Sequence, residues 1–235
     1  DIRTLADSLG VTFPRSHAYF MIGSMIQGDI RPDQDYYELA THRCIRAAEI
    51  LGSEYCVVHP VSMLDADGNV DYEESFRYNR EYFSNLLEFA ESHHVGLAIE
   101  NLSANLQNGF SLRYGADIHQ LLQLVDSLNH PKVGVCLDTG HAHLARLDVP
   151  EVIRTLGNRL YTTHIADNHQ NADEHLPPFG GTIPWEKVMQ AFKEIGYQQD
   201  FTFEVQGFVR PYPQELQQPL IDFTSALGHW MLEEL

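Results

Sequence analysis

Short apolar runs alternate with longer helical segments along the whole chain of 235 residues, and this alternation limits the possible folds more than any other feature. Apolar and polar residues do not alternate within these runs, and this pattern is typical of strands buried on both faces of a sheet. Strand–helix–strand units of this kind are right-handed and build a parallel sheet. The expected strands are residues 11–19, 55–60, 95–101, 133–137, 160–165 and 200–205, and the expected helices are residues 1–9, 33–51, 72–93, 116–128, 149–156, 185–195 and 214–234.

Six strands that alternate with helices favour an α/β fold of the (β/α)8 TIM-barrel type. A complete barrel usually needs about 250 residues, and the chain opens on a helical segment that Gly10 ends. We therefore expect one barrel domain over residues 1–235 that lacks its first one or two strand–helix units. An open doubly wound sheet is the alternative, but no glycine-rich phosphate-binding sequence follows any of the strands.

The net charge limits the classes of binding partner, and the cysteines indicate the cellular compartment. There are 33 acidic and 15 basic residues, and the net charge of −18 repels phosphate backbones and anionic membranes. Nucleic acid is therefore an unfavourable partner, and no apolar stretch approaches the roughly 20 residues of a membrane span. Cys44, Cys56 and Cys136 show no C-x-x-C spacing, so we expect free thiols in a cytoplasmic protein.

Each expected strand ends at or near a residue that can bind a divalent metal or transfer a proton. A barrel brings the carboxyl ends of all its strands to one mouth. Carboxylates that meet there repel one another unless a cation balances them. Carboxylate oxygen and imidazole nitrogen without a thiolate suit Mn²⁺, Mg²⁺, Co²⁺ or Zn²⁺. The strand-end residues are His17, His59, Glu100, Asp138, His164 and Glu204.

The sequences around these residues resemble the xylose isomerase-like TIM barrels. That superfamily contains sugar and sugar-phosphate isomerases and epimerases, together with AP endonucleases of the endonuclease IV type. The resemblance extends over about residues 1–207, and the order of the motifs is its specific part. The motifs are SHAY at 16–19, VVHP at 57–60, LAIEN at 97–101, VGVCLDTGHAH at 133–143, HIAD at 164–167 and DEHLPPFGG at 173–181.

The resemblance implies a central divalent metal held by Glu100, Asp138, His164 and Glu204. In this reading the protein is an isomerase or epimerase of a sugar, sugar phosphate or sugar acid. Glu100 and Glu204 are its catalytic residues, and they exchange a proton from opposite sides of the substrate through an enediolate. Asp167 would not bind the metal itself but would orient the ligand His164 through its carboxylate. Enzymes of this shape often pair through their outer helices, so a homo-oligomer is possible.

Five further residues separate the two activities of the superfamily. In the AP endonucleases nine side chains hold three zinc ions, and the four central residues with these five match all nine positions. In a sugar enzyme the five would bind a second metal or the substrate, and for His17 and His59 a structural role as packed histidines is an equal alternative. We rank the sugar enzyme first, because HIADN replaces the Asn-Asp-Ser run of the nucleases and because the acidic charge opposes DNA binding. The five residues are His17, His59, His141, Asp173 and His175, whereas His143 is expected to be structural.

Overall fold

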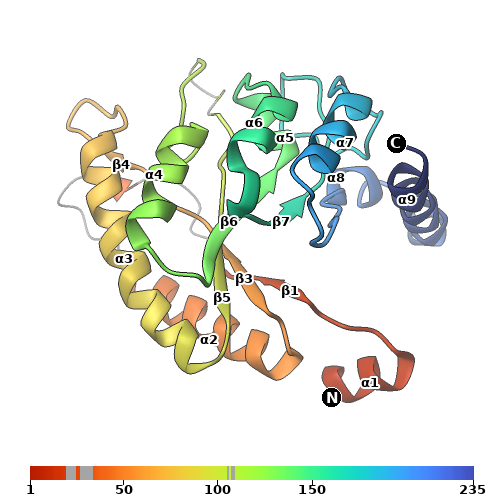
Figure 1. The fold of residues 1–235 in the computed structure, drawn as a ribbon, viewed down its shortest axis with the longest axis horizontal. Coiled ribbons are helices and arrows are strands. Elements are labelled where there is room, and N and C mark those ends of the chain that lie inside the picture. The colour runs from red at the N-terminus through yellow and green to blue at the C-terminus, as the bar shows by residue number, and fades with distance from the viewer. Residues whose placement is uncertain (20–24, 27–33, 105, 107–108) are drawn as a thin grey trace. The chain divides into compact units, whose positions relative to one another are not determined.

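The computed structural model describes residues 1–19, 25–26, 34–104, 106 and 109–235 (Figure 1). The chain forms two compact units, which are described one after the other. The first unit consists of residues 1–100 and 119–135, and the second of residues 101–118 and 136–235. Residue 33, the expected start of the second helix, lies outside the described residues.

The first unit is built on parallel strands, as the alternation predicts. β1 (Arg15–His17), β3 (Tyr55–Val58) and β5 (Gly96–Glu100) pair in this order, and the start of β6 (Val133–Asp138) follows β5. All five residues of β5 are buried, which explains the unbroken apolar run before Glu100. A small second sheet, which the sequence did not predict, pairs β2 (Met25–Ile26) with β4 (Met63–Leu64).

Helices connect these strands at the expected places. α2 and α3 pack against each other, and α2 also packs against β3 while α3 packs against β5 (Figure 1). Gly10 and Gly52 follow the first two helices with φ angles of 67° and 78°, so both glycines end their helices in the left-handed conformation, and Gly10 ends the first helix as the sequence predicted. The helices are α1 (Ile2–Leu9), α2 (Gln34–Leu51), α3 (Tyr72–Ser92) and α4 (Ile118–Leu128). The first residue of α4, Ile118, belongs to the second unit, and the rest of this helix belongs to the first.

The second unit contains the end of β6, the strand β7 (Leu160–His164) and the C-terminal helices. α6 and α7 pack against each other, and Ile153, Leu156 and Trp185 are fully buried. Pro150 lies in the first turn of α6, where its fixed φ angle suits the helix, and the side chain of Asp148 caps this helix. The helical elements are α5 (Thr139–Leu144), α6 (Val149–Leu156), η1 (Gly157–Arg159), α7 (Trp185–Glu194), α8 (Gln206–Val209) and α9 (Gln214–Glu234).

The expected sixth strand, residues 200–205, is wrong as a regular strand. Within the described part of the chain, this segment forms one parallel bridge, between Ile165 and Phe203, and no ladder. The hydroxyl of Thr163 donates to Asp200 O at 3.0 Å and accepts from Thr202 N–H at 3.2 Å. This side chain takes the place of backbone partners, so the segment runs beside β7 without forming a full ladder.

Two simpler expectations concern cysteines and membranes. The three cysteines are free thiols, and Cys56 and Cys136 are buried. Burial raises the pKa of the Cys56 thiol to about 11. None of the helices in the described ranges combines the length and the apolar character needed to cross a bilayer.

Candidate metal centre

Three of the four central ligand candidates meet in the second unit. Asp138 ends β6, His164 ends β7, and Glu204 follows the bridge residue Phe203. One ligand atom from each of Asp138, His164 and Glu204 lies within 4.8 Å of the others. His164 Nδ1 is 2.8 Å from Glu204 Oε2. We call these three residues the central triad.

The local fold holds Asp138 firmly at the strand end. Its Oδ1 accepts the His141 N–H at 2.7 Å and so caps α5. The side-chain amide of Asn101 bonds both the backbone N–H of Asp138, at 2.7 Å, and its carbonyl, at 3.0 Å. Asn101 was not among the site residues predicted from sequence, although its place directly after Glu100 in the LAIEN motif was a usable signal.

The members of the central triad suit a divalent cation. Asp138 is completely buried and His164 is 8% exposed, while the side chain of Glu204 keeps 28% of its exposure. Two carboxylates beside an imidazole in such a place favour a bound cation, since burial alone penalises their charge. Two oxygen donors and one nitrogen donor fit Mn²⁺, Mg²⁺, Co²⁺ or Zn²⁺.

A second cluster in the same unit joins His141, Asp173 and His175. Asp173 Oδ2 lies 3.3 Å from His141 Nε2 and 3.6 Å from His175 Nε2. The Nδ1 atoms of the two histidines donate to the carbonyls of Asn101, at 2.9 Å, and Glu204, at 3.1 Å. A carbonyl can only accept, so in the neutral rings the proton sits on Nδ1 and the Nε2 lone pairs face the carboxylate. His141, Asp173 and His175 could therefore hold a cation, which would offset the repulsion between the lone pairs and the carboxylate.

The charges in this second cluster support one another. Burial opposes ionisation of Asp173, but interactions with His141 and His175 outweigh it and hold the pKa of the carboxyl far below its ordinary value. The interaction with Asp173 raises the pKa of His175 to about 9 against the effect of burial. The cluster is therefore arranged for a positive charge, whether it is carried by protons or by a metal ion.

In the first unit the remaining candidates also gather. Glu100 is 1% exposed, and its Oε2 lies 3.2 Å from His17 Nε2 and 3.0 Å from His59 Nε2. His17 Nδ1 donates to Ala18 O at 2.7 Å, which again leaves Nε2 toward the carboxylate. Because β1, β3 and β5 are neighbours in a parallel sheet, their carboxyl ends bring these three residues together.

Asp167 does not have the contact that the sequence analysis assigned to it. Its buried carboxylate accepts hydrogen bonds from the backbone of Asn168, Gly181 and Ile183 and from the indole of Trp185. Among the described residues, none of its hydrogen bonds goes to His164. The side chain of Asp167 points to the loop that follows β7 and not to the candidate metal ligand His164.

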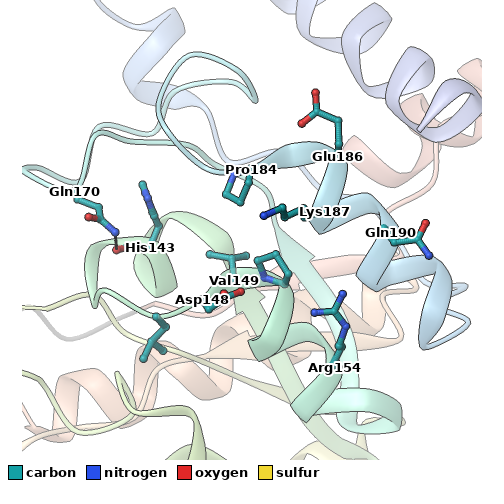
Figure 2. Close-up of a pocket in the computed structure, with 11 residues that line it drawn as sticks. His143, Asp148, Val149, Arg154, Gln170, Pro184, Glu186, Lys187 and Gln190 are labelled. Atoms are coloured by element: carbon teal, nitrogen blue, oxygen red, sulfur yellow. Dashed lines mark hydrogen bonds between the residues drawn. The ribbon is translucent and has the colours of Figure 1, made fainter.

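His143 is buried and lies outside both clusters, as expected for a structural residue. Its Nδ1 lies 3.0 Å from Asn168 Oδ1, and Gln170 Nε2 donates to its carbonyl at 3.1 Å. It lines a pocket of about 620 Å³ beside the start of α6 and α7, together with Gln170, Lys187 and Arg154 (Figure 2). None of the nine candidate metal ligands lines this pocket.

Comparisons with known proteins agree with the motifs. A D-psicose 3-epimerase from Enterocloster bolteae is 29% identical over 150 residues, which is 63% of this chain and 45% of that protein. A crystal structure of D-psicose 3-epimerase in the presence of D-fructose has a TM-score of 0.75 at 16% identity, covering 98% of this chain and 82% of the other. A structure of IOLI protein with a binding zinc atom has a TM-score of 0.74 at 17% identity, covering 100% and 82%.

The chain spans about half the length of the curated relatives it matches, with 53%, 54% and 45% of three of them covered. A family model described as the xylose isomerase-like TIM barrel matches residues 1–224. The match covers most of the chain and includes every candidate ligand. The chain therefore belongs to the xylose isomerase-like TIM barrel family, and the α/β barrel class expected from its sequence is confirmed.

Proposed function

We propose that this protein is a divalent-metal-dependent sugar epimerase or isomerase, in which Glu100 and Glu204 transfer the proton. The observation that supports the proposal most strongly is the central triad, in which Asp138 and His164 end β6 and β7 and Glu204 follows the bridge at Phe203. The names of the relatives point to the same reaction class, since a sequence relative and a structural neighbour are D-psicose 3-epimerases. We infer that a small keto sugar, free or phosphorylated, is the substrate.

The proposed ligands of the metal are Asp138, His164, Glu204 and Glu100. We assign Glu100 from the family resemblance and from its place at the end of β5, because a TIM barrel gathers its strand ends at one mouth. A bound divalent ion would polarise a sugar carbonyl and its neighbouring hydroxyl. A zinc ion in the related IOLI structure supports a metal of this type.

The two glutamates are placed in different surroundings. Glu204 Oε1 accepts a hydrogen bond from Gln206 at 3.1 Å, and the side chain remains partly open to solvent and hence to a substrate. Glu100 is buried and held by His17 and His59. One glutamate would remove the proton next to the carbonyl while the other returns a proton from the opposite side, and this inverts the carbon centre.

The second cluster keeps one other activity as a candidate. His141, Asp173 and His175 around a cation are also what a zinc-dependent phosphoesterase of the AP-endonuclease type would need. Such an enzyme would hold three zinc ions per chain. The net charge of −18 opposes binding to a phosphate backbone, so we place this activity second.

Solvent-hydrogen exchange tests the proposed reaction. The protein with Mn²⁺ or Co²⁺ is incubated with each of a panel of ketoses in deuterium oxide, and the products are followed by NMR. We expect one ketose to epimerise and to take up deuterium at the carbon that inverts. The Glu91→Gln variant, at an exposed surface glutamate, should behave like the wild type. Absence of exchange with every sugar of a broad panel would contradict the proposal.

A further inference from the structure

The carboxylate of Asp167 is buried in an unusual way. The residue is completely buried, and the described residues contain no ion pair to it. Its Oδ1 accepts from Asn168 N–H at 2.8 Å and Ile183 N–H at 3.2 Å. Its Oδ2 accepts from Gly181 N–H at 3.0 Å and Trp185 Nε1–H at 2.8 Å. Four N–H groups thus replace the water that the charge would otherwise need.

The main chain of Asp167 holds the same loop at a second place. Its N–H donates to Leu176 O at 2.8 Å, and the N–H of Leu176 donates back to Asp167 O at 3.0 Å. Leu176 directly follows His175. Asp167 therefore holds the loop 168–184 by hydrogen bonds at two places. Its backbone binds the loop next to His175, and its side chain binds it at Gly181–Trp185.

The loop needs these hydrogen bonds because it contains strained backbone. Gln170, His175 and Phe179 have φ angles of 62°, 49° and 67°, which non-glycine residues adopt at a cost of about 1–3 kcal/mol each. Such conformations persist only where surrounding contacts hold them. His175 is one of the strained residues, and its ring belongs to the second cluster. If the loop came free, His175 would relax away from Asp173.

Close packing at Gly181 shows how tightly the loop is seated on Asp167. A Cβ atom at this position would collide with Asp167 Oδ1 and with the carbonyl of Asn168. A side chain larger than hydrogen must therefore push the loop away from the carboxylate. On the other side of the loop, a Cβ at Gly207 would collide with the carbonyl of Glu174.

From these contacts we propose that Asp167 is a positioning residue: it holds the loop 168–184 so that Asp173 and His175 face His141. This role differs from the orientation of His164 that the sequence suggested. The effect on turnover rests on the proposed epimerase function, because the second cluster would then bind a second metal or the substrate. The effect on loop geometry holds for any activity of this site.

The Asp167→Asn variant of the full chain tests the proposal. Asparagine keeps the shape but has one acceptor oxygen, and its NH₂ group would face N–H donors. Amide hydrogen exchange at Gly181 and Ile183 should become at least about tenfold faster, while exchange in α6 stays unchanged. The NMR signals of the His175 ring should shift, and kcat should fall at least about tenfold while KM changes less.

The matched control is Asp148→Asn, at the exposed cap of α6, where asparagine serves as well as aspartate. It should leave every readout as in the wild type. If Asp167→Asn does not fold, Gly181→Ala displaces the loop from the same carboxylate and should give the same loop exchange and His175 shifts.

Unchanged exchange at Gly181 and Ile183 with an unchanged His175 signal in a folded variant would overturn the proposal. Equal acceleration of all amides would also overturn it, because the residue would then serve only overall stability. If the wild type shows no epimerase activity, the proposed function fails, whereas the exchange and the His175 signals still decide whether Asp167 positions the loop.

Discussion

Replacing Glu204 with glutamine is expected to lower kcat for epimerisation by about 10²–10⁴-fold, the usual contribution of a positioned acid or base. Glutamine keeps the length of the side chain and one oxygen, which can still accept the hydrogen bond from Gln206, so the local packing should survive. It cannot accept a proton from carbon. The variant should therefore stay folded and lose proton transfer from one side of the substrate.

The Glu100→Gln variant should show a loss of similar size, and the two variants together give a sharper result than either alone. Each variant keeps one glutamate, so it should still exchange the hydrogen of one epimer with deuterium oxide without producing the other epimer. NMR of the recovered sugar measures this exchange. A Glu204→Gln enzyme that epimerises within tenfold of the wild-type rate would rule out the proposed role of this residue.

The second large effect is expected from Asp138→Asn on metal binding. A ligand present at 100 times its dissociation constant stabilises the native state by about 2.7 kcal/mol. For a chain of this size that corresponds to a rise in Tm of roughly 5–11 °C. Wild-type protein should show such a rise with a saturating divalent metal, and Asp138→Asn should lose most of it, because a charged oxygen ligand is gone.

The design separates the loss of metal from the loss of a helix cap. Asp138 also caps α5 through Oδ1, but asparagine caps a helix as well as aspartate does, so the metal-free variant should keep a Tm close to that of the wild type. Asp148→Asn makes the same change at the cap of α6 and should keep the full metal effect. Equal metal-induced shifts in Asp138→Asn and the wild type would show that Asp138 is not a ligand.

Much of the fold could be predicted from the apolar runs, because a buried parallel strand leaves a clear mark in sequence. β5, β6 and β7 lie within one residue of the expected bounds. α5 was missed, since a six-residue helix of sequence TGHAHL is too short to show a helical period. The expected strand at 200–205 failed because the Thr163 hydroxyl, which is distant in sequence, replaces backbone partners.

The residues of the candidate site could be predicted from sequence more easily than the contacts between them. Strand-end position was enough to find Asp138, His164 and Glu204, which the structure brings together. The contact of Asp173 with both His141 and His175 follows from the path of a long loop, and sequence spacing does not give such a path. For the same reason Asp167, three residues after His164, was assigned to the wrong neighbour.

A crystal structure of the protein grown with Mn²⁺ and Zn²⁺ is the decisive measurement for the proposed metal centre, because anomalous scattering counts the ions and identifies each one. We expect an ion bound by Asp138, His164 and Glu204, with Glu100 as a further ligand and at most one second ion at His141, Asp173 and His175. Three zinc ions held by all nine candidate residues, or no ion on the central triad, would contradict this expectation.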